Sequence, residues 1–185
     1  MIQKYTYGTP FETDAIVTSI PASKGTPAYG TISTENGFSF TYDMDDNDVV
    51  YGLGESNRGI NKRGYVYESN CSDQPNHTED KISLYGAHNF LVISGKQTFG
   101  LFVDYPGKLK FDIGYTLSSQ LKITCEDADL YLYVIEGETP YDIVKQFRKI
   151  IGRSYIPPKF AFGFGQSRWG YTTMTLKCAR TEVSP

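Results

Sequence analysis

The chain has 185 residues and a formal net charge of −3, a length that supports one sizeable hydrophobic core and predicts one main domain. The mildly negative charge excludes the electrostatic footprint of a nucleic-acid-binding protein, and no basic block indicates an anionic membrane surface. No stretch approaches the roughly 20 apolar residues of a membrane-spanning helix, and the N-terminus lacks the apolar core of a signal peptide, so we expect a cytoplasmic protein. The three cysteines, at positions 71, 125 and 178, fit neither a disulfide framework nor a zinc site, and we expect no metal or cofactor.

Strand signals dominate the first three quarters of the chain. Residues 1–28 are polar and contain three prolines, which indicates an extended segment with at most one or two strands. An Asn36-Gly37 turn then separates two alternating runs and predicts a β-hairpin. The acidic run Asp43–Asp48 lacks the glycine and glutamate positions of a calcium loop and is interpreted as a solvated loop. Further strand-like runs occupy residues 49–55, 89–93, 98–106, 108–115, 121–124 and 130–135. Seven or more short strands joined by turns predict an antiparallel β-sandwich.

One segment breaks the strand period. Thr139 is a typical helix N-cap and Pro140 suits the first helical position. The apolar residues that follow recur at helical spacing and form one stripe: Ile143, Val144, Phe147, Ile150 and Ile151. Gly152 is a typical helix terminator. We therefore expect one helix of about three turns.

The run after Pro157-Pro158 has the pattern of a further strand. Phe160, Phe162 and Phe164 alternate with small residues, and the polar residues Gln166-Ser167-Arg168 then precede the chain's single tryptophan, Trp169. An indole beside amide and guanidinium donors suits sugar binding, because the apolar face of a sugar stacks on the ring. The alternative is a buried core aromatic, and the residues alone leave both readings open.

The polar loop at residues 69–83 contains Asp73, His77, Glu79 and Asp80. Hydrolysis of a glycosidic bond needs two carboxyl groups at a defined separation, and nothing in this spacing forces such a pair. Charges on a solvated loop are the simpler interpretation. A metal site made of His77, Glu79, Asp80 and His88 lacks a recognisable ligand spacing.

A series of short motifs keeps a constant order across residues 29–173. These motifs are Tyr51-Gly52-Leu53-Gly54-Glu55, Asn61-Lys62-Arg63-Gly64, Ser72-Asp73-Gln74, Tyr85-Gly86, residues 99–106, Glu138-Thr139-Pro140-Tyr141-Asp142, Gly152-Arg153, Pro157-Pro158 and Gln166-Ser167-Arg168-Trp169-Gly170-Tyr171. Together they resemble the N-terminal portion of glycoside hydrolase family 31, and among its members most closely a bacterial α-glucosidase. The resemblance implies a galactose-mutarotase-like β-sandwich packed against a (β/α)8 barrel. It also implies retaining hydrolysis of α-linked glucosides by two catalytic aspartates on later barrel strands, beyond residue 185.

The resemblance assigns two substrate-binding residues and no catalytic or metal-binding residue. Asp73 matches an aspartate on a loop that reaches over the barrel mouth and hydrogen-bonds sugar hydroxyls, and Trp169 matches an aromatic residue that lines the same pocket. We expect a β-sandwich at 1–138, a linking helix at 139–156, the first strand of a truncated barrel at 157–173 and a tail at 174–185. The tail departs from the family pattern, and we interpret it as an artificial or frameshifted end of a longer gene.

These expectations define three candidate functions. The first is the N-terminal fragment of an α-glucosidase, inactive alone, whose partners are an α-glucoside or oligosaccharide and the missing barrel. The second is a stand-alone carbohydrate-binding β-sandwich. The third is a mutarotase-type epimerase, which needs a positioned histidine and carboxylate and would draw on His77 or His88.

Overall fold

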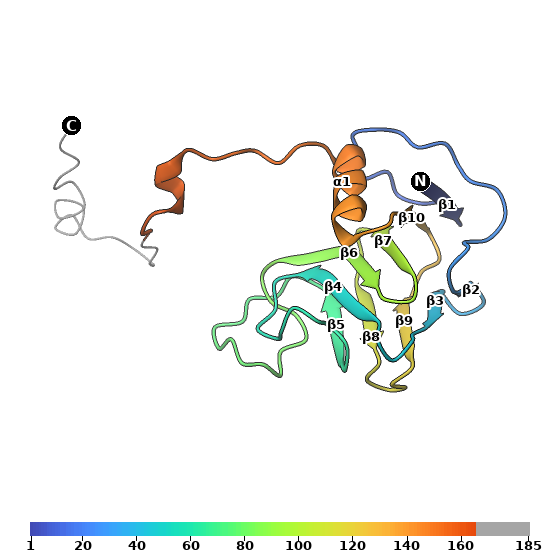
Figure 1. The fold of residues 1–185 in the computed structure, drawn as a ribbon, viewed down its shortest axis with the longest axis horizontal. Coiled ribbons are helices and arrows are strands. Elements are labelled where there is room, and N and C mark those ends of the chain that lie inside the picture. Colours follow the sequence, from blue (N-terminus) through green and yellow to red (C-terminus); the bar gives the residue numbers. More distant parts are fainter. Residues whose placement is uncertain (166–185) are drawn as a thin grey trace. The chain divides into compact units, whose positions relative to one another are not determined.

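The structure is a computed structural model that describes residues 1–165, within which ten strands form two five-stranded sheets (Figure 1). The order of the first sheet is β1 (Ile2–Tyr7), β10 (Leu130–Glu136), β7 (Thr98–Asp104), β6 (Ala87–Ser94) and β4 (Val49–Gly54). The order of the second is β2 (Thr31–Ser33), β3 (Phe38–Asp43), β9 (Gln120–Cys125), β8 (Leu109–Ile113) and β5 (Tyr65–Ser69). Every pairing between these strands is antiparallel. The predicted mainly-β antiparallel sandwich is confirmed.

Alternation along each strand builds the core between the two sheets. In β3, Phe38 and Phe40 point inward and are at most 1% exposed, opposite Cys125 and Ile123 of β9 in the strand register. In β7, Phe99, Leu101 and Val103 supply the facing layer. Strands with a period of two place these side chains on one face, where their burial drives the two sheets together. The predicted turn at Asn36-Gly37 joins β2 to β3, and Gly37 adopts a φ of +78° that a side chain would strain.

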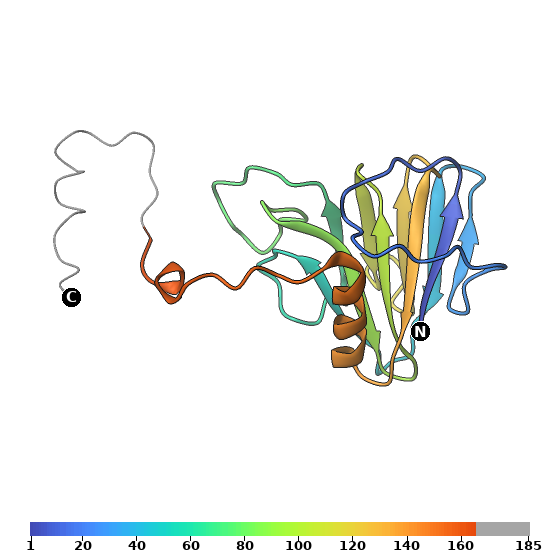
Figure 2. The same ribbon diagram turned by 90° about the horizontal axis from the view of Figure 1, so that it is seen from above.

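The α-helix α1 (Pro140–Ile151), the only one within residues 1–165, covers the outer face of the first sheet (Figure 2). Thr139 is its N-cap and Pro140 its first residue, as predicted, and the structure adds a capping box between Thr139 and Asp142. Phe147 stacks on Phe90 of β6 with ring centroids 3.9 Å apart, and Ile143 lies over Gly100 of β7, where a Cβ would come within 2.4 Å of it. The apolar stripe of the helix therefore forms a second hydrophobic layer, outside the sandwich.

The chain divides into two compact units, Met1–Arg153 and a second unit that begins at Ser154 and is described as far as Gly165. Within the second unit, Lys159–Phe162 form a short 3-10 helix, η1, so the strand predicted there is wrong for these four residues. A strand needs a neighbouring strand to complete its hydrogen bonds, and residues 154–165 contain no strand that could pair with this run. Local turn bonds form instead, from the amide of Ala161 to the carbonyl of Pro158 and from Gly163 to Phe160.

The remaining predictions for this part of the chain concern Trp169, the expected barrel strand from residue 166 to 173 and the tail at 174–185, all of which lie outside the described residues. Neither helix within residues 1–165 combines the length and the apolar character needed to cross a lipid bilayer.

Candidate functional site

A long loop between β5 and β6 contains most of the polar side chains that the sequence singles out. Its two ends are tied together by the amide of Ser72, which donates to the carbonyl of Leu84 at 2.9 Å, and by the hydroxyl of Ser83, which donates to the carbonyl of Asn70. Glu55, just after β4, donates its amide to the carbonyl of Gly86 at 2.6 Å and accepts the Gly86 amide on its carboxylate at 2.9 Å. Leu84 is buried beneath the loop with 3% of its surface exposed. The loop is therefore closed and anchored at its base.

Asp73 is exposed on this loop, where the hydroxyl of Tyr85 donates to its Oδ1 at 2.6 Å. Within residues 1–165 this is the only side-chain hydrogen bond that the Asp73 carboxylate accepts, and Oδ2 takes no part in it. The bond to Asp73 raises the pKa of the Tyr85 phenol, because the carboxylate stabilises the protonated form. Tyr85 thus fixes the orientation of a carboxylate that still has acceptor capacity for a ligand.

Two aromatic rings accompany this carboxylate. The rings of His77 and Tyr85 meet edge to face with centroids 5.4 Å apart. We call Asp73, His77 and Tyr85 the Asp73 cluster. Carboxylate oxygens accept hydrogen bonds from sugar hydroxyls, and exposed rings offer apolar surface to the sugar face, so the cluster has the chemistry of a saccharide contact.

The other acidic residues of the loop do not join the Asp73 cluster. Asp80 accepts a hydrogen bond from the hydroxyl of Thr78, which lowers the pKa of the Asp80 carboxyl. Glu79 contributes its backbone carbonyl to Arg58 at 2.7 Å. Within residues 1–165, the side-chain hydrogen-bonding partner of Asp73 is therefore the phenol of Tyr85.

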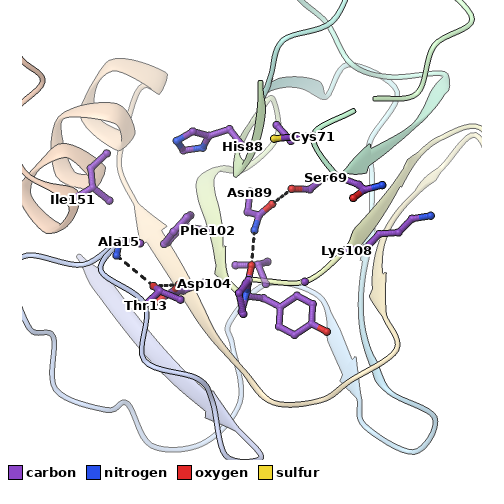
Figure 3. Close-up of a pocket in the computed structure, with 16 residues that line it drawn as sticks. Thr13, Ala15, Ser69, Cys71, His88, Asn89, Phe102, Asp104, Lys108 and Ile151 are labelled. Atoms are coloured by element: carbon purple, nitrogen blue, oxygen red, sulfur yellow. Dashed lines mark hydrogen bonds between the residues drawn. The ribbon is translucent and has the colours of Figure 1, made fainter. Parts of the chain in front are cut away.

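A groove of about 750 Å³ borders the loop on the side of α1 (Figure 3). Asp104, 5% exposed, accepts a 2.6 Å hydrogen bond from the hydroxyl of Thr13, and burial raises the pKa of its carboxyl. Ser69 donates to the side-chain oxygen of Asn89, whose amide donates to the carbonyl of Tyr105 at 3.2 Å. These polar groups are hydrogen-bonded to one another. The bond from Thr13 to Asp104 attaches the N-terminal segment to β7, so we interpret the groove as the junction between that segment and the sheet.

His88 also lines this groove. Its ring meets Phe147 of α1 edge to face at 5.8 Å, and burial lowers its pKa. Among the described residues, no three His, Cys, Asp or Glu side chains gather closely enough to hold a metal ion. The metal ligand set weighed in the sequence, which combined His77, Glu79, Asp80 and His88, is thus not brought together.

Comparison with known proteins decides the family. The family profile described as the glycosyl hydrolase 31 N-terminal galactose mutarotase-like domain matches residues 10–112, more than half of the chain. The chain belongs to glycoside hydrolase family 31. The predicted resemblance is confirmed, and so is the galactose-mutarotase-like fold of this family 31 domain.

Relatives and solved structures agree with this assignment. Alpha-glucosidase 2 of Bacillus thermoamyloliquefaciens is 32% identical over 75% of this chain, and the alpha-xylosidase XylQ of Lactiplantibacillus pentosus is 26% identical over 76%. A family 31 dextranase of Flavobacterium johnsoniae, solved with isomaltotriose, is 25% identical over 72% of the chain with a TM-score of 0.65. The chain spans only 19%, 17% and 16% of the lengths of these three proteins.

Of the two predicted substrate residues, the structure places Asp73 at an exposed loop position, and Trp169 lies outside the described residues. Sequence reasoning missed the direct partner of Asp73. Tyr85 is twelve residues away and entered the sequence argument only through the Tyr85-Gly86 motif. A polar loop that returns to a strand with an aromatic residue gives no spacing signal for such a contact, because the pairing depends on the path of the loop.

Proposed function

We propose that this family 31 domain forms part of a retaining α-glucosidase and supplies one wall of its substrate pocket through the loop that contains Asp73. The observation that carries the proposal is the exposed carboxylate of Asp73, held at 2.6 Å by Tyr85 on a loop anchored to a rigid sandwich. Sites built from firmly supported side chains hold ligands with the precision that catalysis requires. Asp73 would accept hydrogen bonds from sugar hydroxyls near the bond to be cleaved, and Trp169 would help to select the linkage type.

We further propose that the two catalytic aspartates belong to a barrel outside this chain. Retaining hydrolysis requires a nucleophile and an acid/base carboxyl group about 5–5.5 Å apart. The hydrogen bonds of residues 1–165 bring Asp73 to a phenol, which cannot replace the second carboxyl group. The chain by itself would then bind sugar weakly without cleaving it.

The substrate class that this proposal names is α-linked glucosides and their oligosaccharides. Support comes from the similarity to alpha-glucosidase 2 and from the isomaltotriose bound to the dextranase. An alpha-xylosidase is similar over a comparable share of the chain. We infer that the sandwich is a shared component and that residues outside it separate glucosides from xylosides.

The test of this proposal is an assay of the purified chain with an aryl α-glucoside. We expect no turnover above that of a heat-treated sample, since a single loop carboxylate cannot provide both catalytic roles. A robust, heat-labile release of the aryl group would overturn the assignment of catalysis to another domain.

A stand-alone carbohydrate-binding module is the second candidate, and one observation favours it: all members of the Asp73 cluster lie within the sandwich unit. Titration with maltose or isomaltose, followed by the fluorescence of Trp169, separates the two functions. A saturable response at micromolar sugar would favour the binding module, whereas a response only at millimolar sugar or above supports a pocket with one wall present.

A further inference from the structure

Arg58 joins three segments of the sandwich that are distant in sequence. It lies in the connection between β4 and β5 and donates from every nitrogen of its guanidinium group to backbone carbonyls. Nη1 reaches the carbonyl of Val66 in β5 at 2.8 Å, Nε reaches Glu79 at 2.7 Å and Nη2 reaches Asp80 at 3.3 Å. The last two carbonyls belong to the far side of the loop that contains Asp73.

The geometry of this contact depends on the planar fork of an arginine. The guanidinium carbon lies 4.4 Å from the ring centroid of Tyr65 and 5.2 Å from that of Tyr67, so the group packs against aromatic faces while its edge donates. No carboxylate of the described residues forms an ion pair with Arg58. Bonds from a charged donor are stronger than neutral ones, and a lysine would place a single nitrogen where the guanidinium places three.

The segment that carries Arg58 is itself held to the sandwich. Lys62 is 6% exposed, and its Nζ donates to the hydroxyl of Ser56 at 2.9 Å and to the carbonyl of Gly59 at 3.2 Å. The Lys62 amide donates to the carbonyl of Val50 in β4 at 2.8 Å. Beside Arg58, the side chain of Asn57 donates to the carbonyl of His77 at 2.5 Å. Residues 57–58 thus connect the loop at positions 77–80 to a fixed support.

We propose that Arg58 is a positioning residue that sets the geometry of the Asp73 cluster. A loop of this length would otherwise sample many conformations, and each would present the carboxylate and the two rings differently. By holding residues 79 and 80 against β5, Arg58 fixes the far half of the loop, while the bonds of Ser72 and Ser83 fix the base. The role in sugar recognition rests on the proposed function; the ordering of the loop stands independently of it.

The experiment compares Arg58→Lys with the wild type and with Arg63→Lys. Arg63 is a matched control in the same connection, because its guanidinium donates to the carbonyls of Asp45, Asp48 and Ser118, none of which belongs to the loop that contains Asp73. Hydrogen exchange of the Thr78 and Lys81 amides, which donate to the carbonyls of Asn76 and Thr78, reports the order of the far half of the loop. The pH titration of the Tyr85 ring by NMR, assigned with Tyr85→Phe, reports the bond to Asp73.

In Arg58→Lys we expect exchange of the Thr78 and Lys81 amides to accelerate by about tenfold or more and the pKa of Tyr85 to fall back toward its ordinary value. Arg63→Lys should leave both readouts at the wild-type level. Wild-type exchange and an unchanged Tyr85 titration in Arg58→Lys would overturn the proposal. If the lysine variant does not fold, Arg58→Met, which keeps the apolar stem against Tyr65 but has no donors, provides the same two readouts.

A sugar titration of the same variants separates this inference from the proposed function. Weaker binding in Arg58→Lys together with faster exchange supports both. Faster exchange with unchanged sugar affinity confirms that Arg58 orders the loop and overturns its role in sugar recognition.

Discussion

Large apolar side chains are buried in the sandwich but exposed in residues 154–165. Phe38, Phe40 and Phe99 are at most 1% exposed between the sheets. In the second unit the large apolar side chains are 76% to 95% exposed, namely Tyr155, Ile156, Phe160, Phe162 and Phe164. Apolar alternation therefore yields a buried strand only where a neighbouring strand and a facing layer are present.

This difference in exposure suggests that the sandwich determines the stability of the fold, whereas residues 154–165 determine its association with other chains. The sandwich and α1 bury their own apolar surface and should fold independently. Residues 154–165 expose five large apolar side chains, and we expect these to promote association with other chains. The predictions below test this contrast, from the largest expected effect on stability to the smallest.

The largest effect should come from a phenylalanine between the sheets. Phe99→Ala removes a fully buried ring that stacks on Tyr29 and meets the edge of Tyr42. We expect the free energy of unfolding to fall by about 3–5 kcal/mol, measured by urea denaturation. Phe162→Ala is the matched control and should change it by less than about 0.5 kcal/mol. Equal losses of unfolding free energy in the two variants would contradict the distinction between a buried sandwich core and exposed side chains at 154–165.

The second effect concerns the outer layer. Phe147→Ala in α1 removes a ring that is 4% exposed and stacks on Phe90, and we expect a loss of about 3 kcal/mol. Val144→Ala on the same helix is the control, because Val144 is 41% exposed. If both substitutions lower the free energy of unfolding by the same amount, the packing of α1 on the sheet does not depend on its buried apolar stripe.

A third, smaller effect should come from the helix cap. Thr139 accepts the amide of Asp142 at 3.2 Å, and the Asp142 carboxylate accepts the amide of Thr139 at 3.1 Å. Thr139→Ala should lower the free energy of unfolding by about 1 kcal/mol in a thermal or urea melt. Thr139→Ser keeps the acceptor oxygen and should retain most of the stability.

The smallest effect on stability should follow deletion of residues 157–185. The melting temperature of the sandwich should stay near that of the full chain, while large particles seen by dynamic light scattering should decrease, because three exposed phenylalanines of the described part are removed. Equal or greater aggregation of the shortened chain would show that the association surface lies elsewhere.

The sequence predicted those parts of the fold whose signals are local. The hairpin at Asn36-Gly37 and the cap at Thr139 each depend on residues that are neighbours in the chain, and both are present. The run at 157–165 has an equally regular pattern, but a strand also needs hydrogen-bonding partners from elsewhere, and in this unit residues 159–162 form a 3-10 helix instead.

The acidic run shows the same limit for polar residues. The sequence predicts a solvated loop here, yet Asp48 is 1% exposed and accepts hydrogen bonds from the Tyr42 hydroxyl at 3.1 Å, the Asp45 amide at 2.9 Å and the Lys96 amide at 3.0 Å. Lys96 lies 48 residues away, in the turn between β6 and β7. The family motif similarly indicated Asp73 as a candidate, whereas its bond to Tyr85 and the support from Arg58 depend on the folded path of the loop.

The most direct test of the central claim, that the sandwich contacts sugar through Asp73, is an NMR titration of the chain with isomaltose. We predict weak, millimolar binding, with shifts concentrated at residues 72–74, 77 and 85. These shifts should disappear in Asp73→Asn and persist in Asp46→Asn, a change of another exposed carboxylate, in the connection between β3 and β4. Shifts of equal size and position in Asp73→Asn, or no shifts in this loop at saturating sugar, would contradict the account.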